Sequence, residues 1–279
     1  MLYICATPIG NLKDITQRVL ETLENADLIA AEDTRNSLHL LTHFGIRTPL
    51  TSYHEYNKYD KAETLIRKMK EGMDVALISD AGTPGISDPG EVLVRRCIEE
   101  GITVSSLPGP AACITAVTMS GLPTGRFSFE AFLPADKKER KRILDEMRDD
   151  TRTLIVYEAP HHLEATLKEL LDVLGDRPLA VCRELTKRFE SVERMRLSEA
   201  VSYYGENEAR GEFVLVIGGR DAAELKKERQ QQWENMPVEE HVARYEAEGH
   251  DRKEAMKLAA MDRGIPKREI YNMLHKGEL

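Results

Sequence analysis

Short apolar runs alternate with amphipathic segments along the first 120 residues of the chain. The apolar runs predict strands at residues 2–6, 26–31, 74–79 and 103–106. The helical period predicts helices at residues 15–23, 37–44, 61–70, 90–100 and 111–119. The strand runs are continuously apolar, as in strands buried on both faces. Because helices separate the strands, the pattern predicts a mostly parallel sheet with helices on both faces.

A Gly/Pro-rich break at residues 120–125 ends this pattern, and we expect a domain boundary there. A second α/β domain follows, with strands predicted at residues 127–132, 153–157, 179–183 and 212–217 and helices at 137–147 and 163–174. From residue 221 the pattern is helical, with helices predicted at 238–247, 252–261 and 267–274. Gly264 and Pro266 suit a helix end and a helix start, which gives a helix-turn-helix outline. The expected domains are 1–120, 121–220 and 221–279.

The composition is that of a globular protein, with 41% hydrophobic and 31% charged residues among 279. The net charge of −9 argues against charge-driven coating of nucleic acid, although a local basic patch stays compatible with it. Neither a membrane-spanning stretch nor a secretory signal is visible, so we expect a cytoplasmic protein without a membrane partner. The four scattered cysteines indicate buried thiols.

Three Gly/Pro-rich loops follow predicted strands of the first domain. The longest covers residues 79–90, and the others cover 7–11 and 108–112. In an open parallel sheet the carboxyl ends of the strands form the ligand site, and glycine lets the backbone approach a ligand closely. The alternative is a purely structural role for residues 79–90, as a long turn in which Asp88 caps the following helix. Neither GxGxxG nor GxxxxGK[ST] is present, so the loops do not indicate a nicotinamide cofactor or ATP.

Acidic and basic side chains gather at other strand ends. The acids are Glu32, Asp33, Glu158 and Glu184, and the bases beside them are Arg35, Lys187 and Arg188. Such pairs suit a site that positions a hydroxyl group, but each could also be a helix cap or a surface pair. His161 and His162 lack a third ligand at suitable spacing, so we predict no metal site.

The end of the chain carries a small excess of basic residues. Seven lysines and arginines face five acids between Asp251 and Leu279. This pattern fits a solvated helical bundle as well as a nucleic-acid reader.

Nine motifs in order resemble one known family. They are ATPIGNLKDIT, AAEDTR, SYHEYN, LISDAGTPGISDPG, LPGPAA, SGLPTGRFSFEAFLP, YEAPHHL, RELTKRFE and GEFVLVIGG. Together they resemble the small-subunit ribosomal RNA cytidine 2′-O-methyltransferases, a branch of the tetrapyrrole methylase superfamily, over about the first 220 residues. The helical tail is similar to the C-terminal module of that family. The resemblance implies two α/β domains with S-adenosylmethionine in the cleft between them, a homodimer, and a cytidine of the decoding region as substrate.

The resemblance also implies the residues that hold the methyl donor. They are Pro8, Gly10, Asp80, Ala81, Gly82, Pro84, Ile86, Pro110, Ala111, Leu133, Glu212 and Phe213. Two positions depart from the family pattern. Ala111 replaces a usual serine, which removes one hydroxyl contact, and His162 replaces a usual arginine, which removes a fixed charge.

A ribose 2′-hydroxyl is a poor nucleophile and gains from a nearby proton acceptor. The candidates are the four strand-end acids, Glu32, Asp33, Glu158 and Glu184. Contacts to RNA phosphates are expected from Arg35, Lys187 and Arg188 near the cleft, and from Arg252, Lys253, Lys267 and Arg268 in the tail. Two alternatives stay open at this point. One is a tetrapyrrole methyltransferase with the same donor cleft, and the other is a ligand-sensing regulator that binds DNA through the tail.

Overall fold

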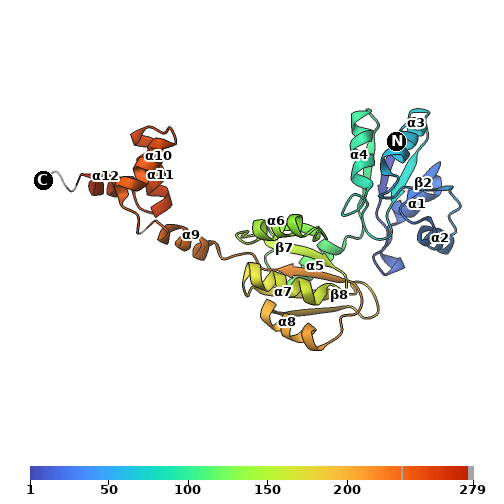
Figure 1. Cartoon of the computed structure of the whole chain (residues 1–279). Helices are drawn as coiled ribbons and strands as arrows, with labels where there is room; N and C mark the ends of the chain where they lie inside the picture. Colours follow the sequence, from blue (N-terminus) through green and yellow to red (C-terminus); the bar gives the residue numbers. More distant parts are fainter. Residues whose placement is uncertain (234, 276–279) are drawn as a thin grey trace. The chain divides into compact units, whose positions relative to one another are not determined.

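The computed structural model describes residues 1–233 and 235–275 (Figure 1). These residues form two compact units. The first unit comprises Met1–Met147 and Arg152–Gly218, and the second comprises Arg148–Thr151 with the described residues after Gly218. The first unit contains two sheets. We call the first sheet with its helices the first lobe, and the second sheet with its helices the second lobe.

The first lobe has a five-stranded parallel sheet in the order β3-β2-β4-β1-β5. Its strands are β1 (Leu2–Cys5), β2 (Leu28–Ala31), β3 (Leu50–Ser52), β4 (Val75–Ile78) and β5 (Val104–Leu107). Its helices are η1 (Leu12–Asp14), α1 (Gln17–Asn25), α2 (Thr34–His43), α3 (Lys58–Lys70) and α4 (Gly90–Glu99).

Alternate side chains of the first sheet enter two different cores. Val75 and Leu77 of β4 join one core, which also contains apolar residues of α3 and α4. Ala76 and Ile78 join the other core, with residues of α1 and α2. Because successive side chains of a strand point to opposite faces, both faces of the sheet are covered by helices. The predicted parallel α/β architecture is therefore confirmed for this lobe.

The second lobe has a mixed sheet in the order β6-β7-β10-β8-β9. Its strands are β6 (Phe127–Phe132), β7 (Thr153–Glu158), β8 (Pro178–Arg183), β9 (Ser191–Arg196) and β10 (Phe213–Ile217). The central strand β10 is antiparallel to both of its neighbours, while β6 and β7 are parallel. Helices α6 (Lys137–Met147), α7 (Leu163–Leu174) and α8 (Leu197–Glu206) share a core with one face of this sheet.

Helix α5 (Ala112–Ser120) packs on the opposite face of the second sheet. Cys113, Ala116 and Val117 share a core with Ile155 of β7 and Val216 of β10. Tyr157 accepts a hydrogen bond from the Cys113 N–H at 3.0 Å. Helix α5 directly follows β5, the last strand of the first lobe, but it belongs to the hydrophobic core of the second lobe. The division into domains 1–120, 121–220 and 221–279 stays a prediction.

Several elements escaped the sequence pattern. These are β3, β9, α8, η1 and α9 (Ala222–Gln231). Strand β3 has only three residues, and all three are only partly buried. Strand β9 is the edge strand of its sheet, and only two of its six residues, Val192 and Met195, are apolar. Both strands therefore lack the continuous apolar run by which the buried strands were found.

The second unit contains a three-helix core made by α10 (Val238–Ala247), α11 (Arg252–Arg263) and α12 (Lys267–Leu274). Gly264 ends α11 in a left-handed conformation with φ 63°, and Pro266 precedes α12. The predicted turn between these two helices is therefore present.

A buried polar network holds α10 to α11. His241 is 0% exposed and stacks on Trp233 with ring centroids 4.0 Å apart. The Arg263 Nε–H donates to His241 Nδ1 at 3.1 Å, so the neutral imidazole carries its proton on Nε2 and donates it to Asp262 at 3.1 Å. Tyr245 donates to the same carboxylate at 2.5 Å. Protonation of His241 would place a second donor against Arg263.

We expect this network to make the second unit sensitive to acid. Burial holds the pKa of His241 below its ordinary value of 6.5, and this outweighs the hydrogen bond to Asp262. A lowered histidine pKa means that stability is present above about pH 6.5 and is lost as the pH falls below it. Because Trp233 is the only tryptophan of the chain, its fluorescence reports unfolding of this unit. The denaturation midpoint should be lower at about pH 5 than at about pH 7.5.

Two variants test the role of His241 in this pH dependence. His241→Gln should lose the dependence, whereas the control His161→Gln should keep it. Equal midpoints at the two pH values in the wild type would contradict the expectation.

Candidate active site

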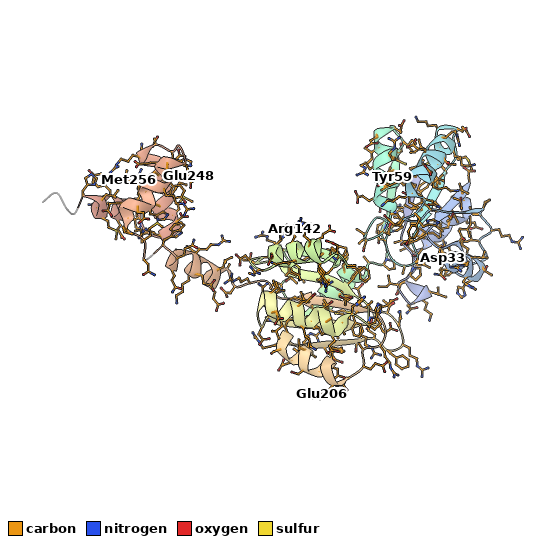
Figure 2. All side chains as sticks on the ribbon, viewed as in Figure 1. Asp33, Tyr59, Arg142, Glu206, Glu248 and Met256 are labelled. Carbon is orange, nitrogen blue, oxygen red and sulfur yellow. The ribbon has the colours of Figure 1, made fainter. Side chains whose placement is uncertain are left out.

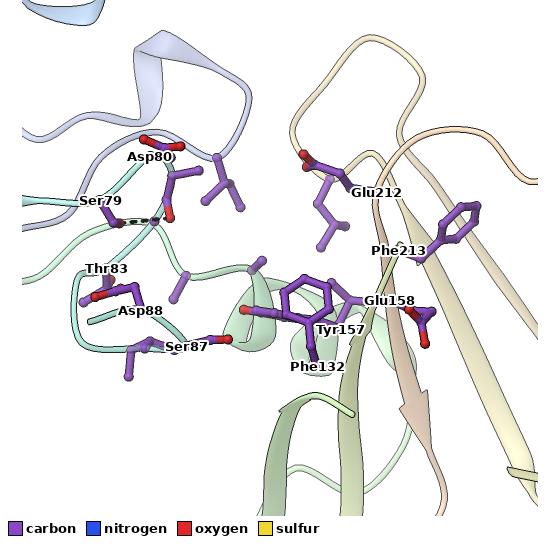
Figure 3. Close-up of a pocket in the computed structure, with 18 of the residues that line it drawn as sticks. Ser79, Asp80, Thr83, Ser87, Asp88, Phe132, Tyr157, Glu158, Glu212 and Phe213 are labelled. Carbon is purple, nitrogen blue, oxygen red and sulfur yellow. Dashed lines mark hydrogen bonds between the residues drawn. The ribbon is translucent and has the colours of Figure 1, made fainter. Parts of the chain in front are cut away.

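A cavity of about 410 Å³ lies at the carboxyl ends of the first-sheet strands and is closed on its other side by the second lobe (Figure 3). We call it the cleft. The lining from the first lobe and the start of α5 is Ile9, Glu32, Ser79, Asp80, Ala81, Gly82, Thr83, Ile86, Ser87, Asp88, Ala111 and Ala112. Its second-lobe lining is Phe132, Tyr157, Glu158, Ala159, Pro160, Leu185, Glu212, Phe213 and Val214.

The loop after β4 is held in a fixed shape by its own hydrogen bonds. The Asp88 carboxylate accepts from the Gly85 N–H at 2.8 Å and from the Gly90 N–H at 2.8 Å. Gly82 exchanges two backbone hydrogen bonds with Thr7, at 2.8 and 3.0 Å. Gly82 has φ +86°, a backbone conformation that residues other than glycine rarely adopt. Two of the three predicted loops therefore meet directly.

Asp80 connects this loop to the segment after β2. Its carboxylate accepts from the Asp33 N–H at 3.1 Å and from the Asn36 amide at 3.4 Å. The third predicted loop joins through Thr83, which donates to the Pro110 carbonyl at 2.9 Å. The ends of several strands are thus brought to one place, as the position of the loops predicted.

The four candidate acids have different environments, and Glu32 combines a place in the cleft lining with a raised pKa. Burial raises the pKa of Glu32 above its ordinary value, and the nearby charges of Asp80 and Asp88 add to this effect. Asp33 accepts from Arg35 at 2.7 Å and from the Arg35 N–H, which lowers its pKa to about 2. Asp33 lies at the start of α2 as its N-cap (Figure 2). It does not line the cleft.

Glu158 and Glu184 are both engaged in hydrogen bonds. Glu158 is 6% exposed and accepts from the Ala159 N–H at 2.8 Å and from Thr166 at 2.5 Å. Figure 3 shows its side chain on the opposite side of β7 from the Tyr157 hydroxyl. Burial raises the pKa of Glu184, but hydrogen bonds from the Glu212 N–H and from Lys187, each at 2.9 Å, outweigh it and leave the pKa below its ordinary value.

Aromatic side chains form the second-lobe wall of the cleft. The rings of Phe132 and Tyr157 meet edge to face with centroids 5.5 Å apart. Phe132 is 54% exposed, so its ring offers an apolar surface to a ligand in the cleft. Neither ring was among the predicted donor residues, although Tyr157 lies within the motif YEAPHHL.

The loops of the two lobes touch closely beside the cleft. A Cβ atom at Gly10 would lie 2.5 Å from Cγ of Lys187 and 2.9 Å from Oγ1 of Thr186. Lys187 also binds Glu212 at 3.0 Å. Gly10 therefore allows a contact between the lobes that any side chain would prevent.

The structure brings together seven of the twelve predicted donor residues. The cleft lining includes Asp80, Ala81, Gly82, Ile86, Ala111, Glu212 and Phe213. The other five lie elsewhere. Pro8 and Gly10 line a neighbouring cavity, Pro110 lines a third, Leu133 is buried in the core of the second lobe, and Pro84 lines none of the three.

The sequence pattern missed other lining residues, including Ser79, Thr83 and Leu185. Each lies within one of the quoted motifs, which is the signal that could have found it.

The predicted RNA-binding residues lie in three places. Arg35 is paired with Asp33, and Lys187 is paired with Glu184 and Glu212. The Arg188 guanidinium lies over the ring of Phe189, 5.4 Å from its centroid. Arg252, Lys253, Lys267 and Arg268 belong to the second unit.

Comparisons with known proteins identify the family to which this architecture belongs. The family model for tetrapyrrole (corrin/porphyrin) methylases matches residues 1–201. The chain belongs to this family. It is 49% identical over 275 residues to the ribosomal RNA small subunit methyltransferase I of Halalkalibacterium halodurans, covering 99% of this chain and 94% of the relative. It is 45% identical to the protein of the same name from Bacillus subtilis, with the same coverage.

Solved structures of the same fold include two with lower sequence similarity. Diphthine synthase has a TM-score of 0.60 at 14% identity, over 78% of this chain and 89% of that chain. Uroporphyrin-III C-methyltransferase from Thermus thermophilus, in complex with S-adenosyl homocysteine, has a TM-score of 0.55 at 20% identity, over 78% and 96%. The family is S-adenosylmethionine-dependent and transfers methyl groups.

The cleft fits a methyl donor of this chemistry. S-adenosylmethionine is positively charged at its sulfur, and the cleft offers the carboxylates of Glu32, Asp80 and Asp88 beside apolar and aromatic walls. Within residues 1–233 and 235–275, no lysine or arginine lines the cleft. Like charges in a partly buried site repel one another, and a bound cation would relieve that repulsion. The predicted cofactor and the observed side chains therefore agree.

Among the residues that the structure describes, no group of three or more histidine, cysteine, aspartate or glutamate side chains is arranged to hold a metal ion. In the same part of the chain, every helix is too short or too polar to cross a bilayer.

Removal of the Asp80 carboxylate should weaken donor binding. In Asp80→Ala the Asp33 N–H loses its acceptor and the cleft loses one negative charge. Charged hydrogen bonds contribute about 1.5–3 kcal/mol, so we expect the dissociation constant of S-adenosylmethionine to rise about 10-fold or more. Calorimetry measures this directly. Asp60→Ala on α3, outside the cleft, is the matched control, and an Asp80→Ala variant with the wild-type constant would remove Asp80 from the site.

Proposed function

We propose that this protein is an S-adenosylmethionine-dependent methyltransferase that methylates the 2′-oxygen of a cytidine in the decoding region of small-subunit ribosomal RNA, on the assembled subunit. The ribosomal substrate is supported by relatives that are 45–49% identical over 99% of the chain and are named ribosomal RNA small subunit methyltransferase I. The ribose oxygen and the decoding region rest on the resemblance of the nine motifs. Methyl transfer to a hydroxyl oxygen is supported mainly by one observation, the half-buried carboxylic acid of Glu32 in the wall of the cleft.

In this proposal the donor is held between the two lobes. S-adenosylmethionine supplies a methyl group bonded to a positively charged sulfur. Asp80, Ala81, Gly82 and Ile86 bind it from the loop after β4. Ala111, Glu212 and Phe213 complete the site. Pro8, Gly10, Pro84, Pro110 and Leu133 shape the loops and the core around these residues.

Glu32 is the proton acceptor in this proposal. The 2′-hydroxyl must lose its proton as its oxygen forms the new bond, and a carboxylate within hydrogen-bond reach receives that proton. A raised pKa makes the ionised Glu32 carboxylate a stronger base than an exposed glutamate. Asp33, Glu158 and Glu184 are held by other hydrogen bonds, so we assign them to positioning of the loops and strand ends.

Basic residues outside the cleft hold the RNA in this proposal. Arg188 and the exposed ring of Phe189 offer a charge and a stacking surface on one loop. Arg35 adds a second contact. In the tail, Arg252, Lys253, Lys267 and Arg268 dock on neighbouring RNA, where phosphate contacts position the strand without reading its sequence. The homodimer that the resemblance implies belongs to the proposal, and sedimentation at the mass of one chain would contradict it.

The lining of the cleft argues against a tetrapyrrole acceptor. Uroporphyrinogen-type tetrapyrroles carry several carboxylates and need basic partners. The described lining of the cleft supplies the acids Glu32, Asp80, Asp88, Glu158 and Glu212 instead of arginine or lysine. Like charges would repel such an acceptor.

Replacement of Glu32 should affect turnover more than donor affinity. Glu32→Gln keeps the size of the side chain but cannot accept the proton, so we expect kcat to fall about 100-fold or more. Because the ionised form is active, wild-type activity should decline as the pH falls through a pKa above the ordinary glutamate value of 4.5. Steady-state kinetics on small subunits measure both effects. Glu21→Gln on α1 is the control, and an unchanged kcat in Glu32→Gln would rule out this role.

Labelled S-adenosylmethionine tests the proposed function against its alternatives. We expect methyl transfer to small subunits, no transfer to a tetrapyrrole precursor and no tight binding of duplex DNA. Replacing Arg252, Lys253, Lys267 and Arg268 with alanine should raise the KM for subunits and leave donor affinity unchanged. Transfer to the tetrapyrrole alone, or DNA binding without turnover, would overturn the proposal. An unchanged KM would refute the docking role of the tail.

A further inference from the structure

A second cavity of about 380 Å³ lies beside the cleft, and the two cavities share Ser79 and Asp80. We call it the side groove. Its lining is Thr7, Pro8, Gly10, Leu12, Asn36, Ser37, His39, Leu40, His43, Ser79 and Asp80. One wall is thus the loop after β1, and the other is a face of α2.

The side groove combines apolar surfaces with hydrogen-bonding groups. Pro8, Leu12 and Leu40 supply the apolar surfaces. Asn36 offers an amide, and His39 and His43 offer ring nitrogens one helical turn apart. Across the part of the chain that the structure describes, no lysine or arginine lines this groove. Such a lining suits a flat heterocycle, which needs apolar contacts on its faces and hydrogen bonds at its edges.

A buried hydroxyl group adds to this picture. Ser37 is 4% exposed, and its Oγ has no hydrogen-bond partner among the described residues. Buried polar groups in folded proteins are nearly always satisfied, so an unsatisfied group beside a cavity suggests a missing partner.

We propose that the side groove holds the base and sugar of the acceptor nucleotide. This inference rests on the proposed function and names the place where its substrate binds. The carboxylate of Asp80 stands at the end that the groove shares with the cleft, where it would accept a hydrogen bond from a sugar hydroxyl and repel a phosphate. The sugar therefore lies at the Asp80 end, and the base lies along α2 toward His43.

The dimensions agree with one nucleoside. The lining residues of α2 run from Asn36 to His43, and seven steps of 1.5 Å along a helix give about 10 Å. This length accommodates a base and its sugar but not a stacked helix of RNA. The 2′-oxygen would then reach the boundary with the cleft, on the side where Glu32 and Asp80 line it.

The test separates acceptor binding from donor binding. In the double variant His39→Ala, His43→Ala, both exposed imidazoles are removed without loss of a core residue. We expect the KM for small subunits to rise about 10-fold, which corresponds to the loss of one or two hydrogen bonds, and the dissociation constant of S-adenosylmethionine to stay within about 2-fold of wild type. Leu38→Ala is the matched control, because Leu38 is 57% exposed on the same helix and lines neither cavity.

A second variant fills the groove instead of emptying it. Leu40→Trp should also raise the KM for subunits and leave donor affinity unchanged, so the proposal does not depend on the histidine variant alone. If the wild type methylates subunits and both variants keep its KM, the side groove is not the acceptor site. If the wild type methylates no subunits, the proposed function fails, and the assignment of a nucleotide to this groove fails with it.

Discussion

The carboxylate of Asp80 is the contact on which the candidate site depends. It stands at the end of β4 and accepts hydrogen bonds from the start of α2 and from the segment that precedes it. The same residue lines both the cleft and the side groove. The cleft and the side groove therefore meet at Ser79 and Asp80, and backbone and amide donors fix the position of the Asp80 carboxylate.

This arrangement concentrates negative charge. Glu32, Asp80 and Asp88 line one partly buried cleft, and their mutual repulsion contributes to the raised pKa of Glu32. Asp88 is stabilised by the N–H groups of Gly85 and Gly90, and Asp80 by its own two donors. A positively charged methyl donor in the cleft would offset the negative charge of these carboxylates.

Sequence reasoning recovered much of the fold and less of its detail. The buried run VALI of β4 and the loop after it were predicted, because a continuous apolar run followed by glycine and proline has few other interpretations. The antiparallel central strand β10 was not predicted, because strand direction depends on connections across the sheet and leaves no local signal. The packing of α5 on the second sheet was not predicted either, since this helix mixes apolar residues with Thr115 and Thr118 and has no single apolar face. Likewise, the four acids could not be ranked from the sequence. Their environments depend on hydrogen-bond partners such as Arg35, Lys187 and Thr166, and the spacing between acid and partner along the chain differs from one acid to the next.

A crystal structure of the protein with S-adenosyl homocysteine would test the central claim most directly. Our account predicts that the product occupies the cleft between the loop after β4 and the second-lobe wall. Its sulfur should face the boundary formed by Ser79 and Asp80, open to the side groove. A product bound on another surface, or one whose sulfur points away from that boundary, would contradict the account.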